Sequence, residues 1–375
     1  MSLTPSNSNL LFVAVGVALG LVACKNEQKP APAPAVAKAA AAPVPAKAGS
    51  EPVEASKAFN PRLLRRFAPV RTVVESATNP ATPEKVQLGR MLYFDKRLSK
   101  NQNVSCNSCH RLDAYGVDSE PTSPGDTGDR GGRNSPTVYH AAGFFTQFWD
   151  GRAPDVEEQA KGPILNPIEM GMPSGDAVVT RLKAIPGYRE AFTKAFPEDS
   201  NPLTYDNVGR AIGAFERGLT TPARWDKYLQ GEKNALTDPE LEGLKVFTNV
   251  GCMVCHTGEF LGGTSYQRVG AVEAWPNQSD PGRFKVTNNA SDRMMFKVPT
   301  LRNIAKTAPY FHDGSAKTLP DAVRMMGKHQ LGLELSDAEV KSIVAWLGAL
   351  TGELPKEYIA TPKLPEGPAK VKEAG

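Results

Sequence analysis

Four of the five cysteines in this 375-residue chain fall in two copies of one short pattern, Cys-x-x-Cys-His. Two thiols one helical turn apart can form thioethers with the two vinyl groups of a haem, and the adjacent histidine then lies under the iron as its proximal ligand. The pattern therefore predicts two covalently bound haem c groups. The first copy is Cys106, Cys109 and His110, and the second is Cys252, Cys255 and His256.

Zinc binding and thiol redox chemistry are the other common uses of such cysteine pairs. A zinc ribbon separates its two pairs by about 15–20 residues, whereas Cys109 and Cys252 lie in different halves of the chain. A thioredoxin-like pair does not require a histidine after each second cysteine. Haem attachment accounts for both copies, so we expect haem at each.

The sequence around the two motifs is repeated as well. Each motif follows a threonine-capped helix start with proline in its first turn, at residues 82–84 and 237–240. Each is followed by a long stretch rich in glycine and proline, and then by a closing helix expected at residues 206–219 and 337–351. Helix, haem motif, loops and helix is the plan of a small c-type cytochrome. The sequence predicts a mainly α fold of two cytochrome-c-like haem domains.

The N-terminal segment is typical of an export signal. Residues 10–23 are uncharged and apolar, a run too short for a membrane-spanning helix of about 20 residues but suited to a signal-peptide core of about 7–15. The ending Leu21-Val22-Ala23-Cys24 resembles a bacterial lipobox, which implies cleavage before Cys24 and lipidation of its thiol. Residues 1–9 lack the usual Lys or Arg, so an ordinary secretion signal or a wrongly assigned start stays open.

The charges are balanced, with 44 Lys and Arg against 40 Asp and Glu, a formal net charge of +4. Such a balance excludes a dedicated nucleic-acid-binding protein. Apolar residues make up 40% of the chain, which is enough for sizeable cores. Residues 25–58 are almost entirely Ala, Pro, Lys, Glu and Val and indicate an extended tether, with a reach on the order of 100 Å.

The sixth position of each iron separates an electron carrier from a catalyst. A Met or His there closes the iron for electron transfer, whereas an open position can react with peroxide. Besides the two proximal residues, His140, His312 and His329 remain, together with nine methionines. Composition alone does not choose among them.

Residues from about 60 to 355 resemble the bacterial di-haem cytochrome c peroxidases, to which the MauG-like tryptophan-oxidising enzymes are related. The resemblance covers nearly all of the chain after the tether and rests on motifs that lie far apart. These motifs are CNSCHRLDAYGVDSEPTSPGD, RNSPTVYHAAGFFTQFWDGRA, GPILNPIEM, KVPTLRNIAKTAPYFHDG and DAVRMMGKHQLG.

The resemblance implies different roles for the two haems. His110 is similar to the proximal ligand of the low-potential haem that reacts with peroxide, and His256 to that of the high-potential haem that accepts electrons. Met326 matches the distal ligand of the second haem, where MauG-like enzymes have tyrosine. The alternative is that Met326, or its neighbour Met325, belongs to the hydrophobic core.

The resemblance also implies a catalytic set. Gln159 and Glu169 match the polar pair of the distal pocket, where a desolvated carboxyl group can move a proton between the peroxide oxygens. Trp149 matches the bridge for electron transfer between the haems. From the residues alone, Glu169 is equally an exposed loop residue, and Trp149 is equally a buried anchor of the domain interface.

A calcium ion between the haems is the further cofactor that the resemblance implies. Its ligands would be the side-chain amide of Asn134 and the main-chain carbonyls of Thr307 and Pro309, which are oxygen donors suited to a hard cation. His312 would have a structural or haem-contact role. His140 and His329 have no role in the family pattern and are expected at the surface or in packing.

One position departs from the family pattern. A loop histidine commonly caps the peroxidatic iron at rest, and here Asp126 occupies that position. Because aspartate is a poor ligand for haem iron, we expect the iron to be open, or to hold water, in the fully oxidised protein. His140 is a less favoured substitute, and the glycine-rich loop itself is a further candidate for gating access.

The domain organisation expected from these features has four parts. These are a signal peptide (1–23), a lipidated tether (24–58), a peroxidatic haem domain (59–220) and an electron-transfer haem domain (221–353). By resemblance, residues 354–375 would pack back on the first haem domain.

The expected reaction is reduction of hydrogen peroxide to water, with electrons from a small periplasmic cytochrome c or cupredoxin. The expected location is the periplasm, with membrane attachment only through lipid at Cys24, and members of the family often form homodimers. The alternatives are a MauG-like oxidase of a protein side chain, a non-catalytic di-haem electron carrier, and a slow peroxide sensor. The distal ligands of the two irons discriminate among them.

Overall fold

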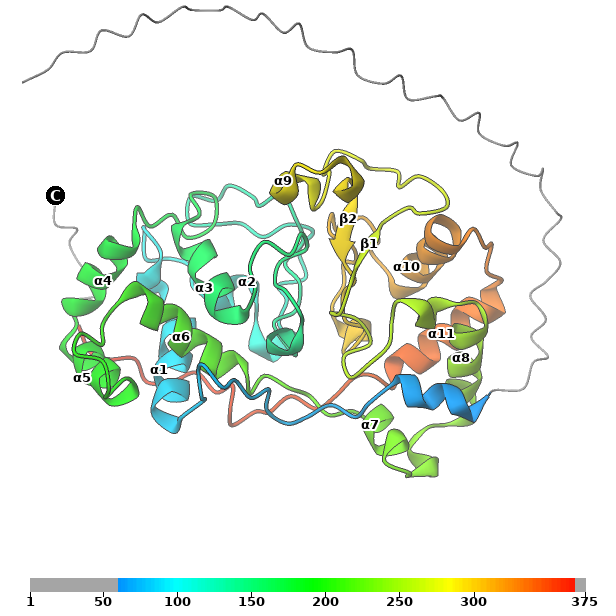
Figure 1. The fold of residues 1–375 in the computed structure, drawn as a ribbon, viewed down its shortest axis with the longest axis horizontal. Coiled ribbons are helices and arrows are strands. Elements are labelled where there is room, and N and C mark those ends of the chain that lie inside the picture. Colours follow the sequence, from blue (N-terminus) through cyan, green and yellow to red (C-terminus); the bar gives the residue numbers. More distant parts are fainter. Residues whose placement is uncertain (1–59, 368–375) are drawn as a thin grey trace, which may run out of the picture. The chain divides into compact units, whose positions relative to one another are not determined.

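The computed structural model describes residues 60–367, and over these residues the fold is mainly helical (Figure 1). The predicted signal peptide, Cys24 and the tether lie outside the described residues. None of the helices in the described part is both long and apolar enough to cross a membrane. The longer helices are α1 (Pro83–Phe94), α3 (Val156–Leu165), α4 (Gly175–Lys183), α5 (Pro186–Ala195), α6 (Tyr205–Glu216), α8 (Asp238–Asn249) and α11 (Asp337–Gly348).

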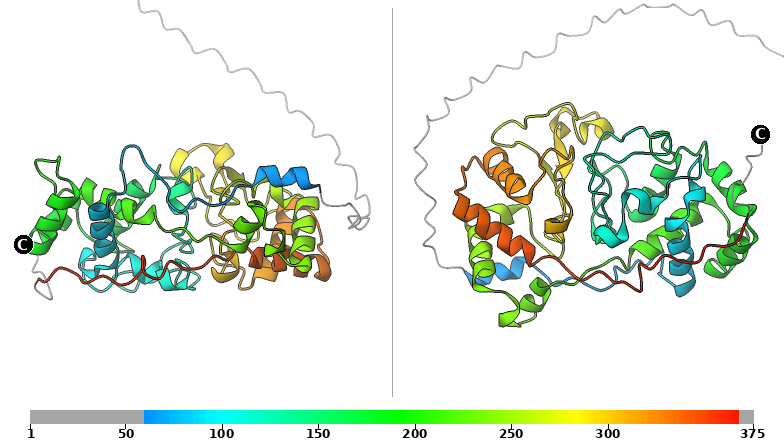
Figure 2. Two further views of the ribbon diagram at one scale, coloured as in Figure 1. Left: turned by 90° about the horizontal axis from the view of Figure 1, so that it is seen from below. Right: turned by 180° about the vertical axis from the view of Figure 1, so that it is seen from behind.

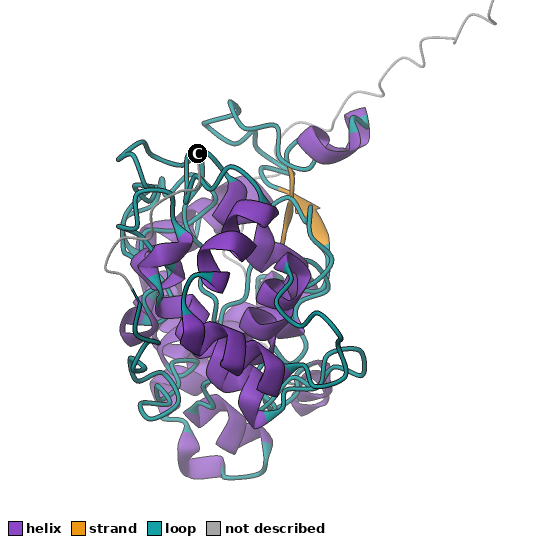
Figure 3. Cartoon of the chain, turned by 90° about the vertical axis from the view of Figure 1, so that its left-hand side faces the viewer, coloured by secondary structure: helices purple, strands orange, loops and turns teal. Residues whose placement is uncertain are grey.

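Short elements and long loops make up the remainder, as the teal segments of Figure 3 show. Strands β1 and β2 form an antiparallel pair in which Tyr266 faces Lys297. A π-helical turn, Met326–Leu331, directly continues α10. The short elements are α2 (Cys106–Cys109), α7 (Arg224–Leu229), α9 (Phe284–Thr287), α10 (Leu319–Met325), β1 (Tyr266–Arg268) and β2 (Met295–Lys297).

The first hydrophobic core is built around the pair α1 and α6. The Thr82 side chain accepts a hydrogen bond from the Lys85 amide and so caps α1. Leu92 and Phe215 are fully buried where the helices meet. A Cβ on Gly89 would lie 1.9 Å from the Ala211 carbonyl oxygen, so this close approach requires glycine.

The second hydrophobic core repeats this plan with α8 and α11. Both helices begin with a capping box, Thr237 with Glu240 and Ser336 with Glu339. A Cβ on Gly243 would lie 1.9 Å from the Ser342 carbonyl oxygen, which parallels the approach at Gly89. The repeat in the sequence therefore corresponds to two helix pairs of the same construction.

Two extended segments run beside both cores (Figure 2). Near the N-terminal end, Phe67 packs in the second core. After α11, Leu354, Tyr358 and Leu364 pack against the first core, and the Tyr358 hydroxyl donates to the Phe215 carbonyl at 2.6 Å. Besides the expected boundary near residue 220 and the expected return of residues 354–375, the chain also crosses between the two cores in its N-terminal segment, which was not expected.

The closing helices end earlier than the sequence indicates. The first ends at Glu216 rather than 219, and the second at Gly348 rather than 351. In both, the following amides bond to carbonyls three residues back, Leu219 to Glu216 and Leu350 to Leu347. Such bonds tighten the last turn and satisfy the free carbonyls, so each helix stops there.

Candidate functional site

A first cavity of about 180 Å³ contains the first Cys-x-x-Cys-His motif. Helix α2 carries Cys106 and Cys109 one turn apart, and the His110 amide bonds to the Cys106 carbonyl at 2.9 Å. The His110 Nδ1 donates to the Pro136 carbonyl at 3.0 Å, which leaves Nε2 for a metal. Burial lowers the pKa of His110 and so favours the neutral imidazole that a metal ligand needs.

A second cavity of about 440 Å³ contains the second motif and repeats this arrangement. The His256 Nδ1 donates to the Leu261 carbonyl at 3.1 Å, so its Nε2 is also left for a metal. Burial raises the pKa of Cys106 and of Cys252 to about 12. In each cavity the thiols, the oriented imidazole and the apolar walls fit a covalently bound haem.

Met326 lines the second cavity together with His256. Met325 instead packs against the second core and does not line the cavity, while both methionines pack against a small cluster around Trp275. A thioether for the distal side of the second haem is therefore available from Met326.

Gln159 and Glu169 line the first cavity with His110. Gln159 lies on α3, whose start is capped by Asp155. Glu169 follows a turn in which the Asn166 side chain accepts from the Ile168 amide and donates to Glu169 Oε1 at 2.9 Å. Burial raises the pKa of Glu169, while the charge of Arg152 and the bond from Asn166 oppose that rise. Glu169, for which the sequence alone left an exposed loop position open, therefore lines the first cavity.

Trp149 lines both cavities. Its Nε1 donates to the Asn134 carbonyl at 2.9 Å, and its own carbonyl accepts from the Lys297 amide at 2.8 Å. The His312 ring lies edge-on to it, with the centroids 6.3 Å apart. Trp149 is therefore both an anchor between the two parts of the chain and, like Phe144, an aromatic side chain in the wall that the cavities share.

Asn134, Thr307 and Pro309 all line the second cavity. The Asn134 side-chain nitrogen donates to the Glu120 carbonyl at 2.9 Å, so its Oδ1 stays available as a ligand. The Asn134 amide also donates to the carbonyl of His312, whose buried Nε2 has no hydrogen-bond partner among the described residues. The three residues thus line one cavity although Asn134 lies far from the other two in the sequence.

Asp126 is buried and does not line the first cavity. Its carboxylate accepts from the Asn101 amide at 2.9 Å and from the Asn101 side chain at 2.6 Å. Its own amide donates to the Glu169 carbonyl at 2.7 Å. Asp126 therefore holds the glycine-rich loop against the Glu169 turn, which the sequence did not reveal.

The remaining histidines, His140 and His329, are held by contacts with neighbouring side chains. His140 is buried, its Nε2 lies 3.0 Å from the Thr221 hydroxyl, and it does not line the first cavity. The partly buried His329 packs edge-on to Trp275, with ring centroids 5.3 Å apart. Neither side chain is placed to cap the first haem.

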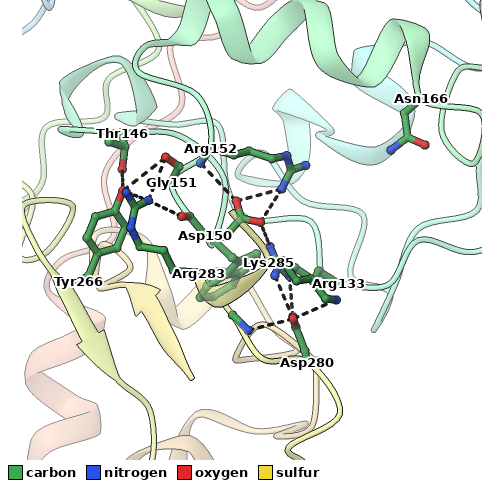
Figure 4. Close-up of polar contacts among 12 residues, drawn as sticks. Arg133, Thr146, Asp150, Gly151, Arg152, Asn166, Tyr266, Asp280, Arg283 and Lys285 are labelled. Atoms are coloured by element: carbon green, nitrogen blue, oxygen red, sulfur yellow. Dashed lines mark hydrogen bonds and ion pairs between the residues drawn. The ribbon is translucent and has the colours of Figure 1, made fainter. Parts of the chain in front are cut away.

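Several residues of the first cavity were not anticipated from the sequence. Arg152 lines it beside Glu169, and Asp150 binds both Arg152 and Arg133 (Figure 4). Burial raises the pKa of Glu216, which also lines the cavity, to about 8. Asp150 and Arg152 lie in the motif that was singled out for Trp149, and Glu216 lies in the first expected closing helix. Their charge is the sequence feature that could have indicated a role at the site.

Comparison with known proteins agrees with a fold that encloses two haem c sites. The sequence profile of the family "Di-haem cytochrome c peroxidase" matches residues 83–234. The chain is 47% identical to cytochrome c551 peroxidase of Nitrosomonas europaea, over 74% of this chain and 83% of that protein. It is 43% identical to cytochrome c551 peroxidase of Pseudomonas aeruginosa, over 83% of this chain and 92% of that protein.

Among solved structures, a MauG-like protein associated with microbial copper homeostasis superposes with a TM-score of 0.71. That match has 31% sequence identity and covers 81% of this chain and 99% of the other. The chain belongs to the family of di-haem cytochrome c peroxidases. The expected family and the mainly α, two-haem fold are thereby confirmed.

Proposed function

We propose that the protein reduces hydrogen peroxide to two waters, consuming two electrons and two protons, with a small cytochrome c or cupredoxin as the donor. The observation that carries the proposal is the chemical difference between the cavities. The first is lined by Gln159 and the carboxyl group of Glu169, whereas the second is lined by Met326 and by no Asp or Glu of the described residues. One cavity is equipped for proton transfer and the other for electron transfer.

When bound, the haem irons supply the redox chemistry. Glu169 takes a proton from one peroxide oxygen and returns it to the other, while Gln159 and Arg152 orient the peroxide. Trp149 would provide an aromatic path between the cavities, and the thioether of Met326 would help to hold the second haem. This thioether, in place of the tyrosine of MauG-like enzymes, favours peroxide reduction over oxidation of a protein side chain.

The fully oxidised protein is expected to turn over peroxide at once, at a rate within about twofold of protein first reduced at its second haem. The physical reason is that Asp126 is bonded to Asn101 and no histidine other than His110 lines the first cavity among the described residues. The measurement is peroxide-dependent oxidation of a reduced small cytochrome c, started from each state.

Optical absorption and electron paramagnetic resonance spectra of the resting protein provide the control for that experiment. We expect a thioether-ligated second haem and a high-spin or water-ligated first haem. A first haem that is entirely six-coordinate and low-spin, with activity only after reduction, would contradict the open site. Met170, which also lines the first cavity, would then be the candidate sixth ligand.

A calcium ion held by Asn134 Oδ1 and the carbonyls of Thr307 and Pro309 is part of the proposal. The convergence of the three residues on the second cavity supports it. Removing calcium with a chelator is expected to slow electron transfer between the haems, and adding calcium back to restore it. Metal analysis that finds no calcium in active protein would contradict this assignment.

For the whole chain we propose export to the periplasm and attachment to a membrane by lipid at Cys24. The apolar run and the lipobox-like ending of residues 10–24 support this proposal. We also propose a homodimer, the form that is frequent in the family. Membrane fractionation of the wild type and of Cys24→Ala tests the anchor, and light scattering tests the dimer.

A further inference from the structure

Lys297 is a buried lysine in the wall that the two cavities share. It ends β2, where it faces Tyr266 of β1. Its amide donates to the Trp149 carbonyl at 2.8 Å, which ties the strand to the opposite part of the chain. The backbone that carries this side chain is therefore held on both sides.

The side chain of Lys297 reaches away from its own part of the chain. Among the described residues, it is the only one beyond Glu216 that lines the first cavity. Its Nζ lies 4.4 Å from the centroid of the Phe144 ring, which lines both cavities. A side chain from the part of the chain that carries the second motif therefore contributes to the wall of the first cavity.

The arginines that line the cavities have oxygen partners. Arg133 binds Asp150 and Asp280, each at 2.6 Å, and Arg152 binds Asp150 at 3.1 Å (Figure 4). Arg268, at the second cavity, donates to two main-chain carbonyls. In the part of the chain that the structure describes, Lys297 has no hydrogen-bond or ion-pair partner for its ammonium group, which lies over the Phe144 ring.

An unpaired buried ammonium is unfavourable, and an aromatic ring offsets only part of its lost hydration. Burial lowers the pKa of Lys297 to about 7. A carboxylate in contact would restore the charged form. The group that enters this cavity carries such carboxylates, since every haem has two propionates.

We propose that Lys297 binds a propionate of the haem attached at Cys106 and Cys109, and that its charge raises the reduction potential of that haem. Adding an electron lowers the net charge of the haem, and a nearby cation favours that change. The pair joins β2 to the haem of the opposite core. It would couple haem binding to the contact between the two parts of the protein.

The test is a spectroelectrochemical titration of both haems in fully loaded protein. In Lys297→Met and Lys297→Gln, the reduction equilibrium constant of the first haem is expected to fall at least tenfold, which is about 59 mV for one electron. The second haem is expected to stay near its wild-type potential. Lys297→Arg, which keeps the charge, is expected to restore most of the first haem's potential.

Lys194→Met is the matched control, because it removes the same charge from an exposed ion pair with Glu190 on α5. It is expected to leave both potentials unchanged, because solvent screens that site. An unchanged first haem in Lys297→Met and Lys297→Gln would overturn the proposal. A shift confined to the second haem would overturn it equally.

Infrared difference spectra provide a second measurement if the neutral variants do not retain haem. Haem labelled with ¹³C at its propionate carboxyls is compared in the wild type and in Lys297→Arg. The labelled carboxylate band is expected to move, because its partner changes from an ammonium to a guanidinium. A band identical in the two proteins would contradict the pairing. Neither measurement uses peroxide, so the result is independent of the proposed reaction.

Discussion

Glu169→Gln is expected to lower kcat for peroxide reduction by about 10²- to 10⁴-fold, the contribution of a positioned proton donor and acceptor. Glutamine keeps the size and the polar contacts of the side chain but cannot carry the proton. Because Glu169 faces the first cavity and is held by Asn166, the loss is expected in the chemical step. The measurement is steady-state turnover with a reduced small cytochrome c, together with the haem spectra of the variant.

The pH dependence gives a second readout of Glu169. Burial raises the pKa of this carboxyl, and the ionised form is the one that accepts a proton. Activity is therefore expected to fall on acidification at a pH above the ordinary range of a glutamate, and this limb is expected to disappear in Glu169→Gln.

Glu158→Gln is the matched control for Glu169→Gln. Glu158 lies on α3 beside Gln159, but it is exposed and pairs with Lys161 at 2.7 Å. Its substitution is expected to leave turnover unchanged. A Glu169→Gln variant that retains more than a third of the wild-type kcat would show that another group moves the proton, and Glu216 would be the next candidate.

Asp226→Asn is expected to destabilise the folded protein by about 3–5 kcal/mol, the usual cost of leaving a buried charge without its partner. Arg302 is completely buried and binds both Asp226 oxygens, at 2.8 and 2.9 Å. The same carboxylate accepts from the amides of Val70 and Ala223, at 2.7 Å each. One side chain thus joins the N-terminal segment, the start of α7 and the loop after β2.

Urea denaturation of the haem-loaded protein, followed by circular dichroism, measures this loss. Glu190→Gln removes one partner of an exposed ion pair on α5 and is expected to leave the unfolding midpoint unchanged. Asp226→Asn with a midpoint equal to that of the wild type would mean that Arg302 finds another partner.

Much of the candidate site could be read from the sequence because its strongest signals are local. A haem c site needs two thiols one turn apart and a histidine beside them, and a five-residue pattern encodes that requirement. Helix caps such as Thr82 and the capping box at Thr237 are local for the same reason. The two haems, the mainly helical fold and the family all follow from short-range patterns.

The tertiary structure decided what depends on residues far apart in the chain. Only packing distinguishes Met326, which lines a cavity, from Met325, which enters the core. The bond from Asp126 to Asn101 and the pairing of Arg302 with Asp226 join segments whose sequences give no sign of each other.

Lys297 is the clearest case of this kind. In the sequence it is an ordinary lysine at the start of KVPTLRN, and nothing nearby indicates burial. The fold places its strand against the Trp149 backbone and its ammonium group over the Phe144 ring. Local patterns determine which haems are attached and where, whereas the charge that surrounds each haem arises from contacts that form only when distant segments pack together.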